Sequence, residues 1–263
     1  MTPWLPSALA AVTLLGGYLG LLARRPAGLP PWPAWRTGLW VAGALTVTAA
    51  LAPPLAEAAA TDHRAHMAQH LLLGMYAPLG LVAAAPVRLT LGSLPTSGAR
   101  RLSALLRSRP LRVLAHPVVA AVLNVGAMFV LYLTPLHERA AESPALTAVV
   151  LLHFLLAGWL YTWAVAGPDP APHRPGLPLR LAVLVVAAGA HAYLAKALYA
   201  RAVEGHHHGG TAHAEAGAQL MYYGGDGAEV LLAVMLLAGW YHRSRPRPLS
   251  PRAPARGGAP AGA

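Results

Sequence analysis

The sequence contains no cysteine among its 263 residues, which excludes disulfide bonds and thiolate metal sites. Charged residues are also scarce, at 11% of the chain compared with about 25% in an average soluble domain. Hydrophobic residues make up 56%, and several apolar runs approach the ~20 residues needed to cross a bilayer core. These features argue against a soluble domain and favour a membrane protein whose soft-metal chemistry depends on His and Met.

Seven apolar segments of helical length follow one another within residues 1–242. They lie near residues 3–22, 37–56, 66–90, 113–133, 145–166, 178–200 and 218–241. Because backbone polar groups in lipid must be satisfied within each segment, we expect an all-α fold, a polytopic bundle of seven transmembrane helices. Pro78 should kink the third helix. Residues 243–263 are rich in Pro, Gly and Arg, which predicts a disordered cytoplasmic tail.

The basic residues alternate from one side of the membrane to the other. Sixteen of the 20 Lys and Arg residues belong to the loops after the first, third and fifth segments or to the tail. Eight of the nine acidic residues fall on the opposite side. By the positive-inside rule, the N-terminus is outside and the C-terminus is cytoplasmic. The net charge of +11 thus reflects topology in a lipid bilayer, and no nucleic acid partner is expected. The excess of Arg over Lys is typical of a GC-rich bacterial genome, so we expect a multi-pass protein of the bacterial cytoplasmic membrane.

Histidines concentrate on the predicted outer side, where ten of the 13 lie. The segment HRAHMAQH places three of them and a methionine at the start of the third apolar run. On an α-helix, His63, His66, Met67 and His70 share one stripe about 100° wide. Imidazole binds copper, zinc, nickel or iron, and thioether favours Cu(I), so this stripe predicts a metal site. The alternative is a set of interfacial polar residues that reach the lipid headgroups.

Two further histidines lie deep in other predicted spans. His153 and His191 each stand about 12 Å from the outer end of their helix, at 1.5 Å per residue. A polar group at this depth is costly and normally faces the interior of the bundle. Either residue could make a hydrogen bond between helices instead. Their shared depth with His66 and His70 favours metal binding.

The last apolar segment carries acidic residues. Gln219, Tyr222, Asp226 and Glu229 recur at helical spacing and form one polar stripe. Two carboxylates inside a span need a cation, protons or water, so we include Asp226 and Glu229 in the predicted metal site. Alternatively the helix begins near Asp226 and leaves both acids in headgroup water. The glycine-flanked histidines at 206–208 predict a solvated loop.

Three segments resemble signature regions of the CtaG-type cytochrome c oxidase assembly factors: HMAQHLLLGMYAPLGLVAAAP, HFLLAGWLYTWAVAGPDP and AQLMYYGGDGAEVLLAVMLLAGWY. The resemblance implies seven spans and a role in maturing haem–copper oxidases by handling copper. It implies functional roles for His66, His70 and His153. It also implies that Gly167, Pro168 and Asp169 form a structural turn on the cytoplasmic side.

Two functions are therefore expected as alternatives. In the first, a membrane-embedded metallochaperone, not an enzyme, binds a copper ion, Cu(I) in particular, with zinc as a second option. It passes the ion to a cytochrome c oxidase subunit, and the sequence is compatible with a homodimer. In the second, the chain is an integral membrane enzyme in which a metal or a haem held by His70, His153 and His191 does the chemistry. A haem would show itself as a strong Soret band.

Overall fold

The computed structural model describes residues 3–206 and 212–244 of the chain, and every regular element in this part is helical. In chain order the α-helices are α1 (Leu5–Ala11), α2 (Gly17–Ala23), α3 (Ala34–Leu51), α4 (Pro53–Ala59), α5 (His63–Leu71), α6 (Ala77–Ala83), α7 (Pro86–Ser93), α8 (Thr96–Leu106), α9 (Arg109–Leu114), α10 (Pro117–Ala121), α11 (Ala127–Leu133), α12 (Leu136–Glu142), α13 (Pro144–Ala166), α14 (Leu177–His206) and α15 (Ala212–Ser244). Three π-turns, η1 (Val12–Gly16), η2 (Leu72–Tyr76) and η3 (Val122–Gly126), join α1 to α2, α5 to α6 and α10 to α11. The prediction of an all-α membrane bundle is confirmed.

Four helices of the described chain are long and apolar enough to cross a membrane: α1 to α2, α13, α14 and α15. Three further spans are bent pairs, with angles of 52° between α3 and α4, 43° between α6 and α7, and 81° between α11 and α12. Counting each pair once gives up to seven spans, at the predicted positions. Which end faces the cytoplasm stays a prediction.

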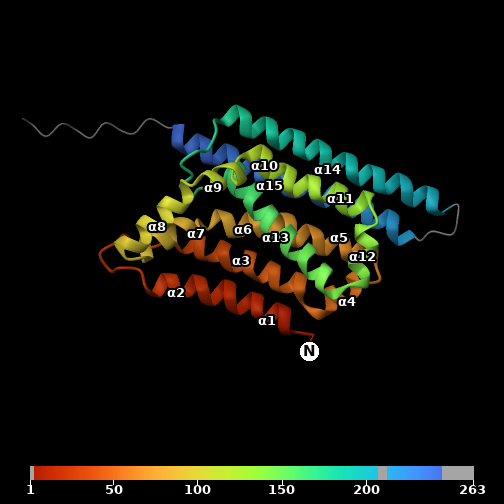
Figure 1. Ribbon diagram of the computed structural model, residues 1–263, viewed down its shortest axis with the longest axis horizontal. Helices are drawn as coiled ribbons and strands as arrows, with labels where there is room; N and C mark the ends of the chain where they lie inside the picture. The colour runs from red at the N-terminus through yellow and green to blue at the C-terminus, as the bar shows by residue number, and fades with distance from the viewer. Residues whose placement is uncertain (1–2, 207–211, 245–263) are drawn as a thin grey trace, which may run out of the picture.

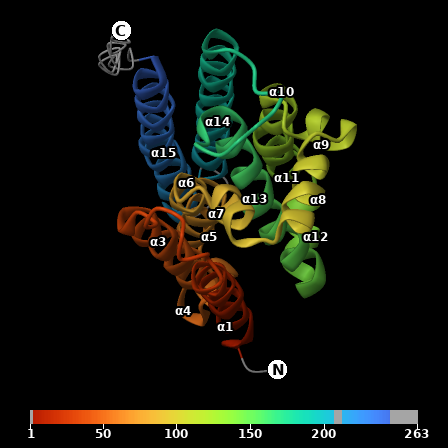
Figure 2. The same ribbon diagram turned by 90° about the vertical axis from the view of Figure 1, so that its left-hand side faces the viewer.

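The third span, α5 to α6, lies at the centre of the bundle. It packs against α3 and α4 on one side, and against α13 and α15 on the others (Figure 2). One core cluster packs against this span, with Met67, Tyr132, Phe154 and Met221 among its buried members. A second cluster, with Tyr18, Trp40 and Leu81, fills the space towards the first two spans. The last turns of α5, with Met67, Gln69 and His70, are therefore buried within protein, which explains how polar side chains are tolerated in this span.

Small residues bring the third and fifth spans into close contact. A Cβ atom at Gly158 of α13 would lie 2.1 Å from the carbonyl oxygen of Gly74 in η2. Only glycine fits such an approach, which is the general pattern of small residues between membrane helices. Ala77, one residue after this π-turn, is likewise completely buried.

The bend between α3 and α4 explains the glutamine of HMAQH. Pro54 has no backbone N–H, so the carbonyl group of Ala50 loses its partner within the helix. Gln69 supplies the replacement, because its Nε2 donates to the carbonyl oxygen of Ala50 over 2.8 Å. Gln69 is thus a structural member of a segment that otherwise carries metal-capable side chains.

The turn implied for Gly167, Pro168 and Asp169 has a clear structural role. The Asp169 carboxylate accepts hydrogen bonds from the backbone N–H groups of Val87 and Arg88, at 3.2 and 2.8 Å. It therefore caps α7 from a distant loop and meets the positive end of that helix. Burial raises the pKa of this carboxylate, and the two backbone hydrogen bonds work against that rise.

The bend of the third span and the connection to the fourth span differ from the sequence predictions. The 43° bend of the third span lies between Ala83 and Pro86, and not at Pro78, which sits in α6 directly after a π-turn. The predicted loop between the third and fourth spans contains two helices, α8 and α9, because Pro and Ser residues separate short amphipathic runs there. Of the histidines predicted in a loop at 206–208, His206 ends α14, and residues 207–211 and 245–263 lie outside the described residues.

Candidate metal site

The helix that carries the histidine stripe begins at the first histidine. Asp62 caps α5 by accepting a hydrogen bond from the backbone N–H of Arg64 over 2.8 Å, and the guanidinium of Arg64 pairs with the same carboxylate. These hydrogen bonds lower the pKa of Asp62 to about 2, so the carboxylate is ionised near neutral pH. His63 is thus the first residue of the helix, and the three histidines of the stripe all belong to regular structure.

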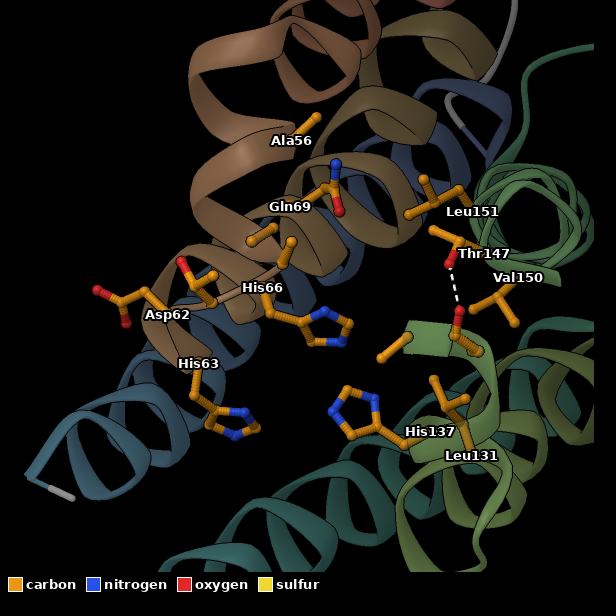
Figure 3. A pocket seen from close by; sticks show the side chains of 15 residues that line it. Ala56, Asp62, His63, His66, Gln69, Leu131, His137, Thr147, Val150 and Leu151 are labelled. Carbon is orange, nitrogen blue, oxygen red and sulfur yellow. Dashed lines mark hydrogen bonds between the residues drawn. The ribbon is translucent and has the colours of Figure 1, made fainter. Parts of the chain in front are cut away.

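The outer histidine cluster consists of His63 and His66 on α5 and His137 on α12. Their rings meet at a cavity of about 280 Å³ at the end of the bundle where α4, α5 and α12 gather (Figure 1). The ring centroids are 4.8 Å apart for His66 and His137, 6.2 Å for His63 and His66, and 6.4 Å for His63 and His137. Figure 3 shows the three imidazoles directed towards the same space, with Asp62 at its rim. This arrangement suits the capture of a cation that accepts nitrogen ligands.

Tyr132 lies on the inner side of this cluster. Its hydroxyl shares a hydrogen bond with Nε2 of His66 over 3.1 Å. Its ring is 5.7 Å from that of His137 and 6.3 Å from that of His70, centroid to centroid. Because Tyr132 is 8% exposed, it closes the cluster towards the interior of the bundle.

The inner histidine pair consists of His70 on α5 and His191 on α14. Their side chains are almost completely buried, at 2% and 1% exposure, and their ring centroids are 6.4 Å apart. None of the four ring nitrogens has a hydrogen-bond partner in the described part of the chain. Buried polar atoms are nearly always paired, so buried imidazole nitrogens without a hydrogen bond leave room for a ligand.

One carboxylate accompanies the inner pair. Oε1 of Glu229 on α15 lies 3.5 Å from Nδ1 of His191, and the Glu229 side chain is 13% exposed. Asp226, one turn earlier, is close enough to interact electrostatically with both residues. The predicted polar stripe of α15 is divided, because Gln219 and Tyr222 line a different groove, beside Lys196. The two acids but not the whole stripe therefore belong to the histidine site.

Glycines of α15 make room for the histidine rings. A Cβ atom at Gly225 would lie 2.1 Å from Cε1 of His191, and one at Gly217 would lie 2.5 Å from Cδ2 of His63. The Gly-Gly-Asp region of the last span thus lets an imidazole rest directly against helix backbone. A side chain at position 225 would therefore displace the His191 ring.

Two predicted ligands are placed elsewhere. His153 on α13 donates from Nε2 to the carbonyl oxygen of Leu123 over 3.0 Å, in the π-turn η3. This is the hydrogen bond between helices that the sequence offered as the alternative to metal binding by His153. Met67 is completely buried in the core cluster that contains Tyr132 and Met221. The role of either residue as a metal ligand stays a prediction.

The structure places two residues at the histidine site that the sequence did not single out, His137 and Tyr132. His137 was one of ten outer histidines, but it follows the 81° bend after α11, and no helical spacing links it to His66. Tyr132 carries no metal-ligand signal at all. Within residues 3–206 and 212–244, no three His, Asp or Glu side chains stand in a ready-made metal geometry. Any ion bound here requires side chains to reorient.

The helices and buried histidines define a class, a multi-pass helical membrane protein with a polar site inside the bundle. Residues 16–243 match the family described as cytochrome c oxidase caa3 assembly factor (Caa3_CtaG), and the chain belongs to this family. The resemblance seen in the three sequence segments is confirmed, as is the multi-pass location in a bacterial cytoplasmic membrane.

Similar proteins occur in mycobacteria. The chain is 34% identical over 197 residues to an uncharacterized protein of Mycobacterium bovis, and equally similar to one of Mycobacterium tuberculosis. An uncharacterized protein of Mycobacterium leprae is 30% identical over 198 residues. The matches cover 72 to 73% of this chain but only 30% of each relative. No solved structure matches the chain.

Proposed function

We propose that this chain is an assembly factor for a haem–copper cytochrome c oxidase, and that it binds copper inside the membrane and delivers it to an oxidase subunit. Its family supports the assembly role. The copper proposal depends on the inner histidine pair, whose four buried ring nitrogens make no hydrogen bond to any residue that the structure describes. In this view copper is the cargo of the protein and not a resident cofactor.

The inner pair fits Cu(I) in chemical terms. Two imidazoles on opposite sides of one ion, with bonds of about 2 Å, place their ring centroids roughly 6 Å apart. The observed 6.4 Å is close to this separation, although the nitrogens themselves would have to turn towards the ion. Cysteine is absent, so imidazole ligands would hold the ion without a thiolate bond. Glu229 would compensate the charge of the ion in a medium of low dielectric constant.

The test is metal retention by the purified full-length chain in detergent. Separate samples are loaded with Cu(I), Cu(II) or Zn(II), washed, and analysed for metal. His66→Ala/His70→Ala should lose most of the retained copper, and His153→Ala, the matched control, should keep it. Unchanged retention in the double variant would contradict the proposal. An absorption spectrum of the same sample with a strong Soret band would favour the haem enzyme instead.

A second experiment addresses the cellular role. A deletion strain should lose cytochrome c oxidase activity, and added copper should restore part of it if the chain delivers this metal. The wild-type gene should restore activity at low copper, and His66→Ala/His70→Ala should not. Full activity of the deletion strain at low copper would contradict the assembly role.

A further inference from the structure

The histidines form two groups, and their surroundings differ. The outer histidine cluster borders a cavity, whereas the inner histidine pair is sealed among helices. Tyr132 stands between the groups and contacts members of both. His66 on the outer side and His70 on the inner side are four residues apart on α5, so successive turns of one helix present the two groups.

We propose that the chain holds two copper stations in series, with the Tyr132 hydroxyl as the latch between them. The outer station is His63, His66 and His137, and the inner station is His70 and His191. This inference rests on the proposed function, because it divides the same copper site into two. It assigns His137 a metal-binding role.

The outer station has the composition of a known ligand set. Three histidines are a common arrangement around one metal ion, with an open position left for exchange. The three rings come from two elements that the 81° bend after α11 brings together, and their centroid separations lie between 4.8 and 6.4 Å. Asp62 lies at the rim of the same cavity, where its carboxylate is paired with the guanidinium of Arg64.

The hydrogen bond of Tyr132 occupies one ring nitrogen of the outer cluster. Nε2 of His66 is engaged with the hydroxyl in either tautomer of the imidazole, so this nitrogen is not free to bind an ion. Release of that hydrogen bond would free His66 and at the same time loosen the ring that separates it from His70. One movement would therefore complete the outer station and open the route inward.

The gradient of environment favours movement inward. The cavity at the outer station admits water, which competes for an ion. At the inner station the imidazoles are at most 2% exposed, and Glu229 supplies a carboxylate beside His191. A cation gains more from a neighbouring negative charge where water is excluded, so the inner station should bind copper more tightly.

The test is an anaerobic titration of the full-length chain with Cu(I) in the presence of a coloured Cu(I) chelator. The wild-type chain should bind two ions of unequal affinity. His63→Ala/His137→Ala should lose the weaker ion alone, and His70→Ala/His191→Ala should lose the tighter ion alone. His153→Ala, with two ions, is the matched control, and circular dichroism of each variant reports whether the helices are intact.

Tyr132→Phe tests the latch. It removes the hydroxyl and keeps the ring, so the outer station should bind about threefold to tenfold more tightly, as expected for loss of one competing hydrogen bond. Unchanged outer affinity would overturn the latch. If the wild-type chain binds a single ion, and either double variant abolishes its binding, the two-station proposal is wrong but the proposed function stands. No bound copper in the wild-type chain would overturn both.

Where a double variant does not fold, His137→Gln and His191→Gln replace it. Each removes the imidazole and keeps a polar side chain of similar size. His137→Gln should weaken only the weaker ion, and His191→Gln only the tighter one. Equal weakening of both ions in both variants would contradict separate stations.

Discussion

His153 and His191 occupy equivalent places in the sequence, yet the structure puts them in different situations. Each lies in a long apolar helix at a similar depth, beside small and aliphatic residues. His153 donates to a carbonyl group that the π-turn η3 presents. His191 has unpartnered nitrogens, the ring of His70 nearby and a carboxylate at 3.5 Å. A deep histidine is thus structural or available for a ligand according to what the opposite helix offers.

The largest difference between the two should appear when each is truncated. His191→Ala should lower copper affinity by more than the roughly 10- to 100-fold that is typical of losing an outer-shell partner, because a direct ligand is lost. His153→Ala should leave copper affinity unchanged. Competition with a Cu(I) chelator measures both. A larger loss in His153→Ala than in His191→Ala would reverse the comparison.

Gly225→Ala should approach the effect of His191→Ala without touching the imidazole itself. The new Cβ would lie 2.1 Å from Cε1 of His191, so the ring must leave its position. Gly189→Ala on α14 is the matched control, because nothing lies within 4 Å of its Cβ. Copper affinity should fall in the first variant and persist in the second. Equal affinities would show that the position of the His191 ring is unimportant.

Glu229→Gln should have a smaller effect, about 10-fold in copper affinity, because it keeps the shape and removes the charge beside His191. Asp226→Asn should weaken binding less, because the carboxylate paired with His191 is that of Glu229. The same chelator competition measures both variants. If Asp226→Asn has the greater effect, Asp226 and not Glu229 is the partner of the bound ion.

The smallest expected effect is the change in protein stability caused by His153→Ala. His153→Ala loses one hydrogen bond between membrane helices, which contributes about 0.6 kcal/mol on average. Unfolding of the variant in detergent should therefore shift only slightly from that of the wild type. A loss of copper together with unchanged stability would show that His153 is a ligand after all.

The sequence predicted the helices of this protein better than the contacts between them. Apolar runs defined seven spans, and the 3.6-residue period placed His63, His66 and His70 on one face of α5. His137 could not be linked to them, because the contact depends on an 81° bend in another span. The difference between His153 and His191 likewise depends on neighbouring helices, and a single sequence without solved relatives does not reveal which helices are neighbours.

The structure was also needed to distinguish the roles of polar residues that lie in one segment. Gln69 lies within HMAQH but completes the backbone hydrogen bonds of a proline-broken helix. Gln219 belongs to the same periodic stripe as Glu229 but lines a groove beside Lys196. Periodicity assigns a residue to a face, whereas its role follows from the partner on the facing helix.

X-ray absorption on Cu(I)-loaded His63→Ala/His137→Ala is the sharpest test of the inner histidine pair, because this variant lacks two of the three outer histidines and keeps both His70 and His191. Copper should be bound by nitrogen ligands at about 2 Å, with imidazole scattering and no sulfur. Addition of His191→Ala should abolish that signal. A sulfur ligand, or an unchanged spectrum after His191→Ala, would contradict the inner histidine pair as the copper site.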